Sequence, residues 1–519
     1  MTKDMTTGKP LAIILLFSIP VLLGNLFQQL YNMVDTVIVG RYLGEEALAA
    51  VGSTGSLMFL VLGFANGMAQ GFGVMVSHAF GAKDFRLLKH YTALSLVLTA
   101  VISAVLTVPT VAASRLLLAW MHTPENIMNM ADAYIRVIFA GIILTMAYNV
   151  LSGILRGIGD SRTPLYFLML SSVLNIALDL FFIVVVPLGT AGAALATVIA
   201  QGISAVLCLI YMFRKYEILR ASREDYYRDF AGVRHMLGIG IPMALNYSVT
   251  AVGTMVMQSA VNVFGSSVVA AFTAASKVSN LSIQTLPTLG TAMATYCGQN
   301  IGAGRYDRIR TSMRQGLYLA IGSALAGALI CTLSGRAVVG LFVNHPSQEI
   351  LSCAMEYLFI ASWFYIPLAM IFLYRNALQG LGQGFVPMVS GGIELACRAG
   401  AIALIPASAG FAGVCFADPA AWVGAAVPLA VTYFVWQKKQ EPLFVANLMT
   451  AGANPGAPDA PAPESAQTGI SAAGQPRSSI TVSAVNTVNL IKGSWRRRRE
   501  DAARRRMHRR GRRFGGHTG

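Results

Sequence analysis

Apolar segments of about 20 residues recur along most of the chain, and each is long enough to cross a bilayer as a helix. Of the 519 residues, 55% are hydrophobic and only 12% are charged, whereas a soluble domain carries about 25% charged residues. This excludes a soluble enzyme, a disulfide-stapled secreted domain and a fibrous protein. It predicts an all-α polytopic membrane protein with twelve transmembrane helices. The predicted spans are 12–39, 48–76, 91–114, 133–155, 164–186, 190–213, 237–262, 270–296, 312–334, 355–379, 387–408 and 412–436.

Lysine and arginine gather in alternate loops. The N-terminal segment, the even-numbered loops with Arg314 just inside the ninth span, and Lys438 and Lys439 directly after the last span hold 19 of them. The odd-numbered loops hold only Arg41, Arg115 and Arg336. By the positive-inside rule both termini are cytoplasmic, and an even number of spans agrees with this. We therefore expect a multi-pass protein of the plasma (cytoplasmic) membrane, surrounded by the lipid bilayer.

Three short motifs recur in the same order at an offset of about 222 residues. They are Ile19-Pro20 and Ile241-Pro242, Gly81-Ala82 and Gly302-Ala303, and Leu155-x-Gly157-x-Gly159-x4-Pro164 and Leu378-x-Gly380-x-Gly382-x4-Pro387. Because each repeat holds an even number of spans, both halves enter the membrane from the same side. The sequence predicts two six-helix lobes related by a parallel repeat, an N-lobe over 1–220 (helices 1–6) and a C-lobe over 221–440 (helices 7–12). Two lobes around a cleft suit a solute transporter, whereas a receptor or a membrane enzyme needs no such duplication.

A proline lies early in the first span of each lobe, at Pro20 and Pro242. Each removes a backbone hydrogen bond and should kink its helix. A static kink and a moving hinge are both open readings.

Two carboxylates lie well inside apolar segments, Asp35 in the first span and Asp179 in the fifth. An ionisable side chain at this depth costs roughly 2.5–3.5 kcal/mol on insertion scales. Asn25, Gln28 and Asn32 precede Asp35 at steps of three and four residues, so the four side chains line one helix face. This pattern predicts a polar site in the N-lobe.

Further oxygen-bearing groups complete this site. Asn175 shares a helix face with Asp179, and Asn149 and Thr197 lie at similar depth in neighbouring spans. Carboxylate, amide and hydroxyl oxygens suit a proton or a small hard cation such as Na⁺, held at Asp35 and Asp179. Two neighbouring carboxylates cannot both ionise cheaply in a low-dielectric interior, so the pair is expected to share a proton. Alternatively, these side chains only hydrogen-bond between helices as packing contacts.

The C-lobe does not repeat this site. The 222-residue offset places Met257 opposite Asp35, with Gln258 beside it. Glu394 and Arg398 are spaced at i, i+4, which predicts an ion pair within one helix rather than a contact with substrate.

Further side chains are candidates for the cleft, because they lie inside the predicted spans or close to the ends of these spans. These are Asn32, Met33, Tyr134, Tyr148, Gln258, Lys277 and Arg375. The two cations among them either reach toward the interface or line the cleft.

Motifs for enzyme chemistry are absent from the sequence. There is no G-x-x-x-x-G-K-[ST] phosphate loop, no G-x-S-x-G, no H-E-x-x-H and no Cys/His cluster. The six cysteines are scattered singly through apolar segments, without metal-ligand spacing. We therefore expect neither an enzyme nor a bound cofactor, and an ion gradient is the energy source that remains.

Several segments resemble the multidrug and toxin extrusion (MATE) transporters, and the resemblance covers residues 10–440. They are Ile19-Pro20 through Met33-Val34-Asp35-Thr36, Gly40-Arg41-Tyr42-Leu43-Gly44, Leu155-Arg156-Gly157-x-Gly159-Asp160-x-x-x-Pro164, Asn175-x-x-x-Asp179, Gly298-Gln299-Asn300-x-Gly302-Ala303-Gly304 and Leu378-Gln379-Gly380-Leu381-Gly382.

The resemblance implies two six-helix bundles around a cleft, and export of organic cations such as drugs and dyes in exchange for H⁺ or Na⁺. It implies that Pro20 marks where the first helix bends when the site is protonated. One branch of the family has an acidic residue in span seven, which this chain lacks, and this favours coupling in the N-lobe. Carried over residue by residue, the cation-coupling site would be Asp35, Asn149, Asn175, Asp179 and Thr197, with Tyr134 nearby.

Three functions follow from these observations. The primary hypothesis is a cation-coupled antiporter that exports organic cations by alternating access and acts as a monomer. The second is a flippase for lipid-linked oligosaccharides from the same superfamily, which would need a more cationic cleft. The third is a non-transporting membrane receptor or scaffold. The sequence leaves open the choice between H⁺ and Na⁺ and the identity of the solute.

Residues 441–519 have a different composition from the rest of the chain. Ala, Pro, Gly and Ser dominate to about residue 480, and 11 arginines follow Trp495. This composition predicts a disordered cytoplasmic tail. It lacks interleaved aromatic residues, so we expect no specific nucleic-acid partner.

Overall fold

The computed structural model describes residues 3–226, 229–342, 347–404 and 409–452, and the regular structure of these residues is entirely helical. Residues 1–450 form one compact unit. A five-residue π-helical turn, Phe181–Val185, follows α7. The helices are α1 (Pro10–Leu43), α2 (Glu45–Gly81), α3 (Phe85–Ala112), α4 (Ser114–Trp120), α5 (Glu125–Ala140), α6 (Ile142–Gly157), α7 (Arg162–Leu180), α8 (Thr190–Lys215), α9 (Phe230–Asn262), α10 (Ser266–Ser282), α11 (Thr285–Gly302), α12 (Tyr306–Phe342), α13 (Gln348–Trp363), α14 (Tyr365–Gly380), α15 (Phe385–Leu404), α16 (Gly410–Cys415) and α17 (Ala417–Gly452).

The helices match the predicted spans, but not every span is one continuous helix. Among the described residues, nine helices are long and apolar enough to cross a bilayer. The pairs α5–α6 and α13–α14, bent by 48° and 54°, raise the number to eleven. The remaining predicted span, 270–296, is divided between the shorter helices α10 and α11. The fold is that of an all-helical polytopic membrane protein.

The sequence repeat has a counterpart in the backbone. Gly159 follows α6 with φ +83°, and Gly382 follows α14 with φ +80°. This left-handed conformation favours glycine, which ends both helices in the same way. The bent pairs also correspond, because their breaks at Gly141 and Phe364 are 223 residues apart. The two halves are therefore built alike, as the parallel repeat predicts.

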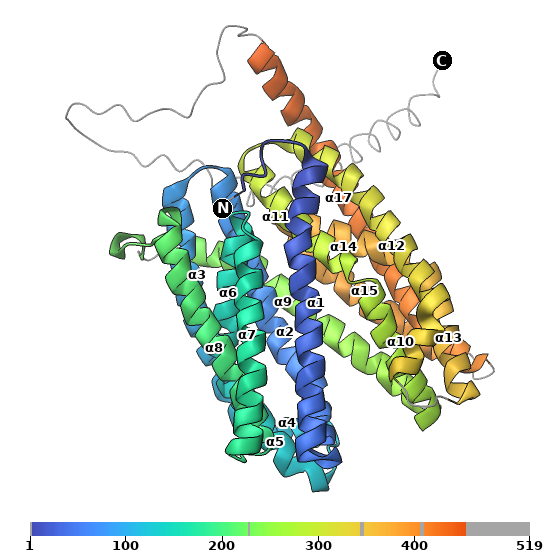
Figure 1. Cartoon of the computed structure of the whole chain (residues 1–519). Helices are drawn as coiled ribbons and strands as arrows, with labels where there is room; N and C mark the ends of the chain where they lie inside the picture. The colour runs from blue at the N-terminus through green and yellow to red at the C-terminus, as the bar shows by residue number, and fades with distance from the viewer. Residues whose placement is uncertain (1–2, 227–228, 343–346, 405–408, 453–519) are drawn as a thin grey trace, which may run out of the picture. The chain divides into compact units, whose positions relative to one another are not determined.

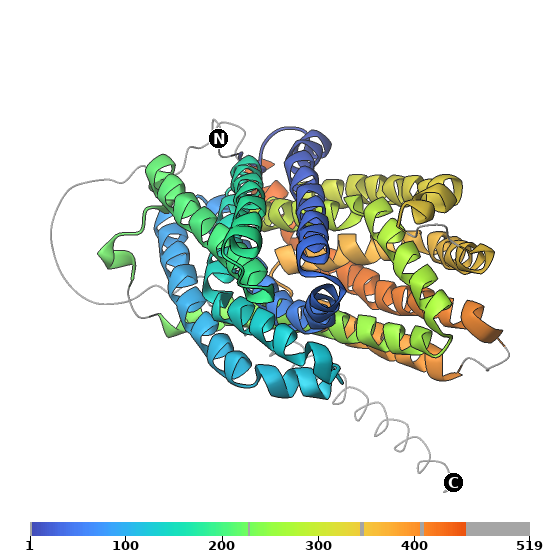
Figure 2. The same ribbon diagram turned by 60° about the horizontal axis from the view of Figure 1, so that its bottom comes forward.

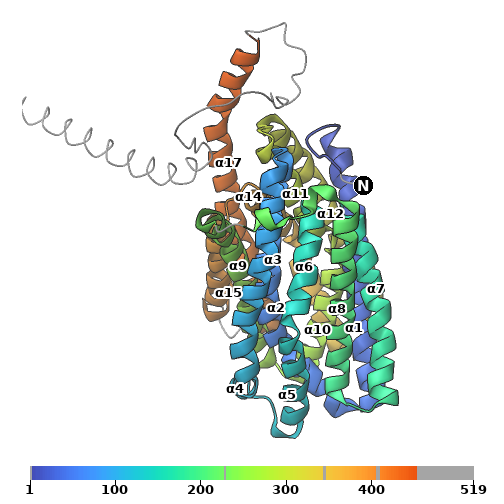
Figure 3. The same ribbon diagram turned by 90° about the vertical axis from the view of Figure 1, so that its left-hand side faces the viewer.

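The buried apolar side chains of the described residues form three cores, and two of these take side chains from both halves, because α1 packs into the core of the second half and α9 into one of the first. In Figure 1, α3, α6, α7 and α8 lie on one side and α10, α12, α13 and α15 on the other, with α1, α2 and α9 between them. Helix α1 contacts α7 of the first set and α12 of the second, and it also contacts α11; Figure 2 shows α1 between the two sets. The short helices α4 and α5 lie at the end of the bundle opposite the N-terminus (Figure 3).

Helices α2 and α11, one from each half, approach each other closely where they end, at Gly81 and Gly302, and we call this the closed end. A β-carbon added at Gly81 would lie 1.9 Å from the Gln299 carbonyl oxygen. His78 Nε2 lies 2.7 Å from the Gly380 carbonyl oxygen. Small residues allow such close helix approach in membranes. The closed end therefore ties the first half of the chain to the second by backbone contact.

The N-terminal segment also takes part in the closed end. Met5 is fully buried in the core of the second half, with Ile14 and Phe17 of α1. Its N–H donates to Gln299 Oε1 at 2.9 Å. Helix α17 runs to Gly452, past residue 440 where the sequence predicts the tail to begin. The rest of the predicted tail, residues 453–519, lies outside the described residues.

Candidate functional site

The structure brings Asp35 of α1 and Asp179 of α7 together. Their carboxyl groups lie within hydrogen-bonding reach of each other. Asp179 is fully buried, whereas Asp35 is half-buried. One oxygen atom of each carboxyl has no hydrogen-bond partner among the described residues. Two carboxyls that face each other in this way can hold a proton between them or ligate a cation.

Asn175 links Asp179 to helix α8. In the orientation that gives both ends of its carboxamide a partner, Nδ2 donates to Asp179 Oδ2 at 3.0 Å, and Oδ1 accepts from Thr197 Oγ1 at 3.2 Å. The choice of orientation follows from the hydrogen-bond network. Asn175 is almost completely buried. The amide therefore fixes one carboxylate oxygen of Asp179, and the other has no hydrogen-bond partner among the described residues.

Two tyrosines stand beside the carboxyl pair. The hydroxyl of Tyr31 lies within hydrogen-bonding reach of the Thr197 and Gln201 side chains. Tyr134, buried on α5, interacts electrostatically with both carboxyls. The sequence prediction included Tyr134 and missed Tyr31 and Gln201. The helical spacing could have indicated both, because Tyr31 lies four residues before Asp35 and Gln201 lies four residues after Thr197.

Asn149 does not join the carboxyl pair in any hydrogen bond of the described structure; it lines a neighbouring cavity. This cavity has an empty volume of about 500 Å³ and lies between α1, α6 and α7. Pro20, Asn25 and Gln28 of α1 line it as well. The kink-forming proline and the polar face of α1 thus border the same cavity.

The other candidate cleft residues lie apart from the carboxyl pair or are solvent- or lipid-accessible. Asn32 and Met33 are exposed on α1. Gln258 is bonded to its own helix, where its Nε2 donates to Asn262 Oδ1 at 2.8 Å. The Tyr148 hydroxyl donates to the Pro164 carbonyl oxygen at 2.9 Å.

The charged residues of the C-lobe form a connected network. Arg398 Nη2 lies 3.4 Å from Glu394 Oε1, within α15 as the spacing predicts. Arg375 Nη2 of α14 lies 2.7 Å from Glu394 Oε2, and Arg398 Nε lies 2.9 Å from Asp418 Oδ1 of α17. The Tyr357 hydroxyl donates to Asp418 Oδ2 at 3.2 Å. Two cations and two anions are thus paired inside the protein.

The two lobes therefore differ in their electrostatics. In the C-lobe network each of the two carboxylates, Glu394 and Asp418, has a guanidinium partner, so the charges of the network balance. In the N-lobe the side chains that hydrogen-bond to the carboxyl pair, among the described residues, are neutral. No group of three or more His, Cys, Asp or Glu that could hold a metal is found in the described part of the chain. The oxygen donors of the N-lobe suit H⁺ or a hard monovalent cation.

The MatE family model matches residues 20–181 and 242–399, one segment in each half of the chain. These segments contain Asp35, Asp179 and the charged pair of α15. The chain belongs to the MATE family. The two matched segments also repeat the division that the 222-residue offset indicates.

Curated relatives of this MATE protein are named as multidrug resistance proteins. The chain is 32% identical over 383 residues to the probable multidrug resistance protein YpnP of Bacillus subtilis, which covers 73% of this chain and 84% of that protein. It is 30% identical over 446 residues to the probable multidrug resistance protein YoeA of the same organism, covering 82% and 94%. The protein is thus a MATE multidrug efflux transporter and not an enzyme.

Solved structures share its fold. One, described as the outward-facing conformation of a multidrug resistance MATE family transporter of the MOP superfamily, has a TM-score of 0.76 at 24% identity, covering 85% of this chain and 97% of that one. A MOP superfamily transporter from Pyrococcus furiosus, whose binding pocket is described as having reverse polarity, has a TM-score of 0.78 at 25% identity, covering 84% and 97%.

Proposed function

We propose that this MATE transporter exports organic cations across the plasma membrane in exchange for H⁺ or Na⁺, with both termini in the cytoplasm. The carboxyl pair of Asp35 and Asp179 is the observation that carries this proposal. The two carboxyl groups can carry negative charge, and the side chains that hydrogen-bond to them are neutral. A proton, Na⁺ or an organic cation can each neutralise this charge. Competition among these cations for one site provides the exchange.

Coupling requires that the bound cation favour one conformation over another. A ligand shifts such an equilibrium only by its difference in affinity for the two states. Asp35 lies on α1 and Asp179 on α7, so protonation or Na⁺ binding changes the repulsion between these two helices. Helix α1 also contacts α11 of the other half. The charge state of the pair therefore acts on a helix that touches both lobes, in which Pro20 is the natural position for bending.

Alternating access also requires that the closed end open. The even-numbered loops and the N-terminus place this end at the cytoplasmic face. We infer that the close packing of α2 against α11 there separates the carboxyl pair from that face in this conformation. We infer that the structure represents a state in which solute leaves toward the outside, and that the coupling cation enters from there.

Two other functions remain as outcomes of the test. A flippase for lipid-linked oligosaccharides would need a cationic cleft, and the Pyrococcus furiosus transporter is described as having reversed pocket polarity. The unpaired carboxyls of the present N-lobe favour cationic solutes instead. A receptor or scaffold would carry no solute at all, and the duplicated lobes argue against it.

The direct test is efflux of a fluorescent organic cation from proteoliposomes under an imposed H⁺ or Na⁺ gradient. Replacing Asp35 or Asp179 by Asn keeps the shape of the side chain and removes the negative charge. We expect gradient-driven flux to fall at least tenfold in each variant, because about 1.4 kcal/mol of lost differential binding already changes a rate or affinity tenfold. Whichever gradient drives wild-type flux identifies the coupling ion.

A matched control is Asp307→Asn, which removes an exposed carboxylate paired with Arg305 near the start of α12. It should leave flux within twofold of wild type. All variants are compared at equal amounts of inserted protein. Undiminished coupled flux in Asp35→Asn and Asp179→Asn would exclude the carboxyl pair as the coupling site. Absence of dye flux in wild type, together with translocation of a lipid-linked sugar, would favour the flippase.

A further inference from the structure

One cation of the N-lobe stands apart from every ion pair in the described structure. Arg156 is the penultimate residue of α6 and is half-buried. Its side chain forms no ion pair and no hydrogen bond with another described residue. The titratable side chains that interact with it electrostatically are Tyr148 and Tyr247, which are neutral at ordinary pH.

Asp160, the acidic residue nearest to Arg156 in the sequence, forms hydrogen bonds with other residues. Asp160 Oδ1 accepts from the backbone N–H of Arg162 and of Thr163, each at 3.1 Å. Its Oδ2 accepts from the hydroxyls of Thr163 and Tyr216 at 2.6 and 2.5 Å. These bonds fix the carboxylate in the turn after α6. Arg156 therefore has no carboxylate partner from this turn.

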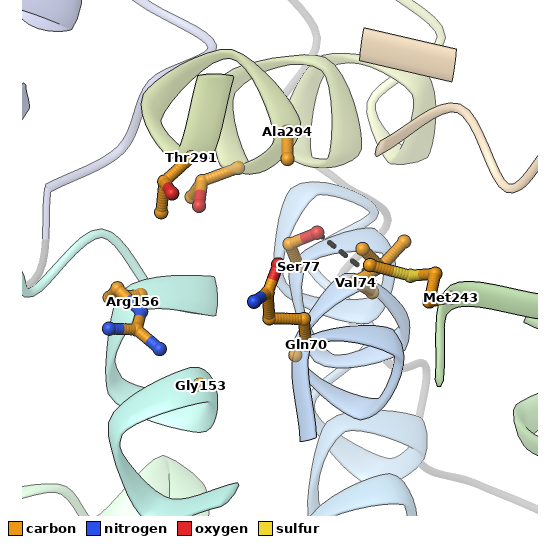
Figure 4. Close-up of a pocket in the computed structure, with 10 residues that line it drawn as sticks. Gln70, Val74, Ser77, Gly153, Arg156, Met243, Thr291 and Ala294 are labelled. Carbon is orange, nitrogen blue, oxygen red and sulfur yellow. Dashed lines mark hydrogen bonds between the residues drawn. The ribbon is translucent and has the colours of Figure 1, made fainter. Parts of the chain in front are cut away.

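Arg156 lines two cavities. One is the cavity that Pro20 borders, and it is also lined by Asn25, Gln28, Asn149 and Ser152. The other has an empty volume of about 380 Å³ and lies where the two halves meet, with Gln70 and Ser77 of α2 and Thr291 of α11 around it. Figure 4 shows these side chains around the second cavity, with Arg156 on α6 across from those of α2. The half-buried Arg156 side chain thus borders two partly open cavities whose polar lining residues are otherwise neutral.

The first of these cavities borders the polar face of α1. Asn25, Gln28, Asn32 and Asp35 follow one another along that face, and ten residues of helix span about 15 Å. On α6, Asn149, Ser152 and Arg156 follow at steps of three and four residues. The N-lobe therefore presents a polar track with a cation at one end and two carboxyls at the other.

We propose that Arg156 binds the carboxylate of amphoteric solutes, which carry an amine and a carboxylate on one molecule. The reasoning rests on the proposed export function. A guanidinium presents parallel N–H donors that match the two oxygens of a carboxylate. A half-buried cation with neutral neighbours gains from such a partner, because hydrogen bonds between charged groups are stronger than those between neutral ones. The amine of the same solute is then drawn toward the carboxyl pair, so the track selects for both charges.

The test compares two dyes that differ only at the acidic group, a xanthene dye with a free benzoate and its methyl ester. Flux is measured with the full chain in proteoliposomes, and binding by fluorescence anisotropy with purified protein. Arg156→Gln should weaken binding of the acid about tenfold or more, since a hydrogen-bonded charged group is lost. Binding of the ester should change less than twofold. Arg156→Lys should recover part of the acid's affinity, because it keeps the charge without the paired donors.

The control is Arg162→Gln, which removes a positive charge from an exposed residue at the start of α7. It should affect neither dye. Equal weakening of acid and ester by Arg156→Gln would show a structural role and overturn the proposal. So would unchanged binding of both dyes. If wild type binds the acid better than the ester through Arg156 but moves neither dye, the export function fails and the anion site stands.

Discussion

At the scale of single residues, the same side chain serves different purposes in the two lobes. Asp418 lies 2.9 Å from Arg398 Nε and accepts a hydrogen bond from Tyr357. Asp179 faces a second carboxyl and an amide. Because a carboxylate that is already paired gains little free energy from a new ligand, Asp418 is suited to a structural role. Because an unpaired buried carboxyl has much to gain, Asp179 is suited to binding.

The C-lobe network can be tested by removing the cation at its centre. Arg398→Gln should destabilise the protein by about 3–5 kcal/mol, because it leaves Asp418 without a cationic partner in the interior. The measurement is the free energy of unfolding in detergent by chemical denaturation. Arg305→Gln breaks an exposed pair with Asp307 and should cost at most about 1 kcal/mol. Equal small losses in the two variants would mean that water reaches the network and supports Asp418.

Residues that are unusual in their surroundings can be singled out from the sequence. Asp35 and Asp179 could be predicted because a carboxylate in an apolar span is costly and therefore rare. The pair Glu394 and Arg398 could be predicted because both lie on one helix. The role of Asp418 could not be predicted, since its partner lies on another helix and only the packing of α15 against α17 brings the two together.

At the scale of elements, the sequence predicts where apolar segments lie better than where helices break. The predicted spans 133–155 and 355–379 are each two helices, bent by 48° and 54°. Hydropathy is summed along a segment and contains no information on direction, so it does not reveal a change in the direction of the helix axis. Gly141 at the first break would have indicated it, but Phe364 at the equivalent position of the second half carries no such signal.

The turn between α6 and α7 offers a test of how a short element is held. Burial by itself would raise the pKa of Asp160, but hydrogen bonds from Thr163 and Tyr216 hold this pKa below its usual value. A lowered pKa stabilises the folded protein above the unfolded-state pKa of about 4, and this stability is lost as pH falls through the lower folded-state pKa. Asp160→Asn should therefore cost about 1 kcal/mol near neutral pH and progressively less below about pH 4.

Thermal unfolding of wild type and Asp160→Asn, followed between about pH 7 and pH 2, measures this difference. The two melting temperatures should converge at the acid end. Asp84 provides the comparison, since its carboxylate accepts from the Leu87 N–H at the exposed start of α3. Asp84→Asn keeps the cap and should cost less. A gap between wild type and Asp160→Asn that stays constant with pH would mean that shape, not charge, holds the turn.

At the scale of the whole membrane unit, the closed end is held by a small number of polar contacts between distant parts of the chain. Gln299 of α11 accepts from the Met5 N–H at 2.9 Å and donates to the Gly157 carbonyl oxygen of α6 at 2.8 Å. Asn300 and Arg308 donate to the Met5 carbonyl oxygen, each at 3.2 Å. One side chain therefore joins the N-terminal segment, the first half and the second half.

These contacts must separate when the closed end opens, so their strength sets how often opening occurs. Gln299→Ala removes two neutral hydrogen bonds, which contribute about 1–3 kcal/mol together. We expect amide hydrogen exchange in the segment around Met5 to become about tenfold faster, because the open state becomes more populated. Gln348→Ala is the control, since Gln348 accepts from Arg336 on an exposed surface elsewhere. If exchange around Met5 is unchanged in Gln299→Ala, the backbone contacts of Gly81 and Gly302 hold the closed end without this side chain.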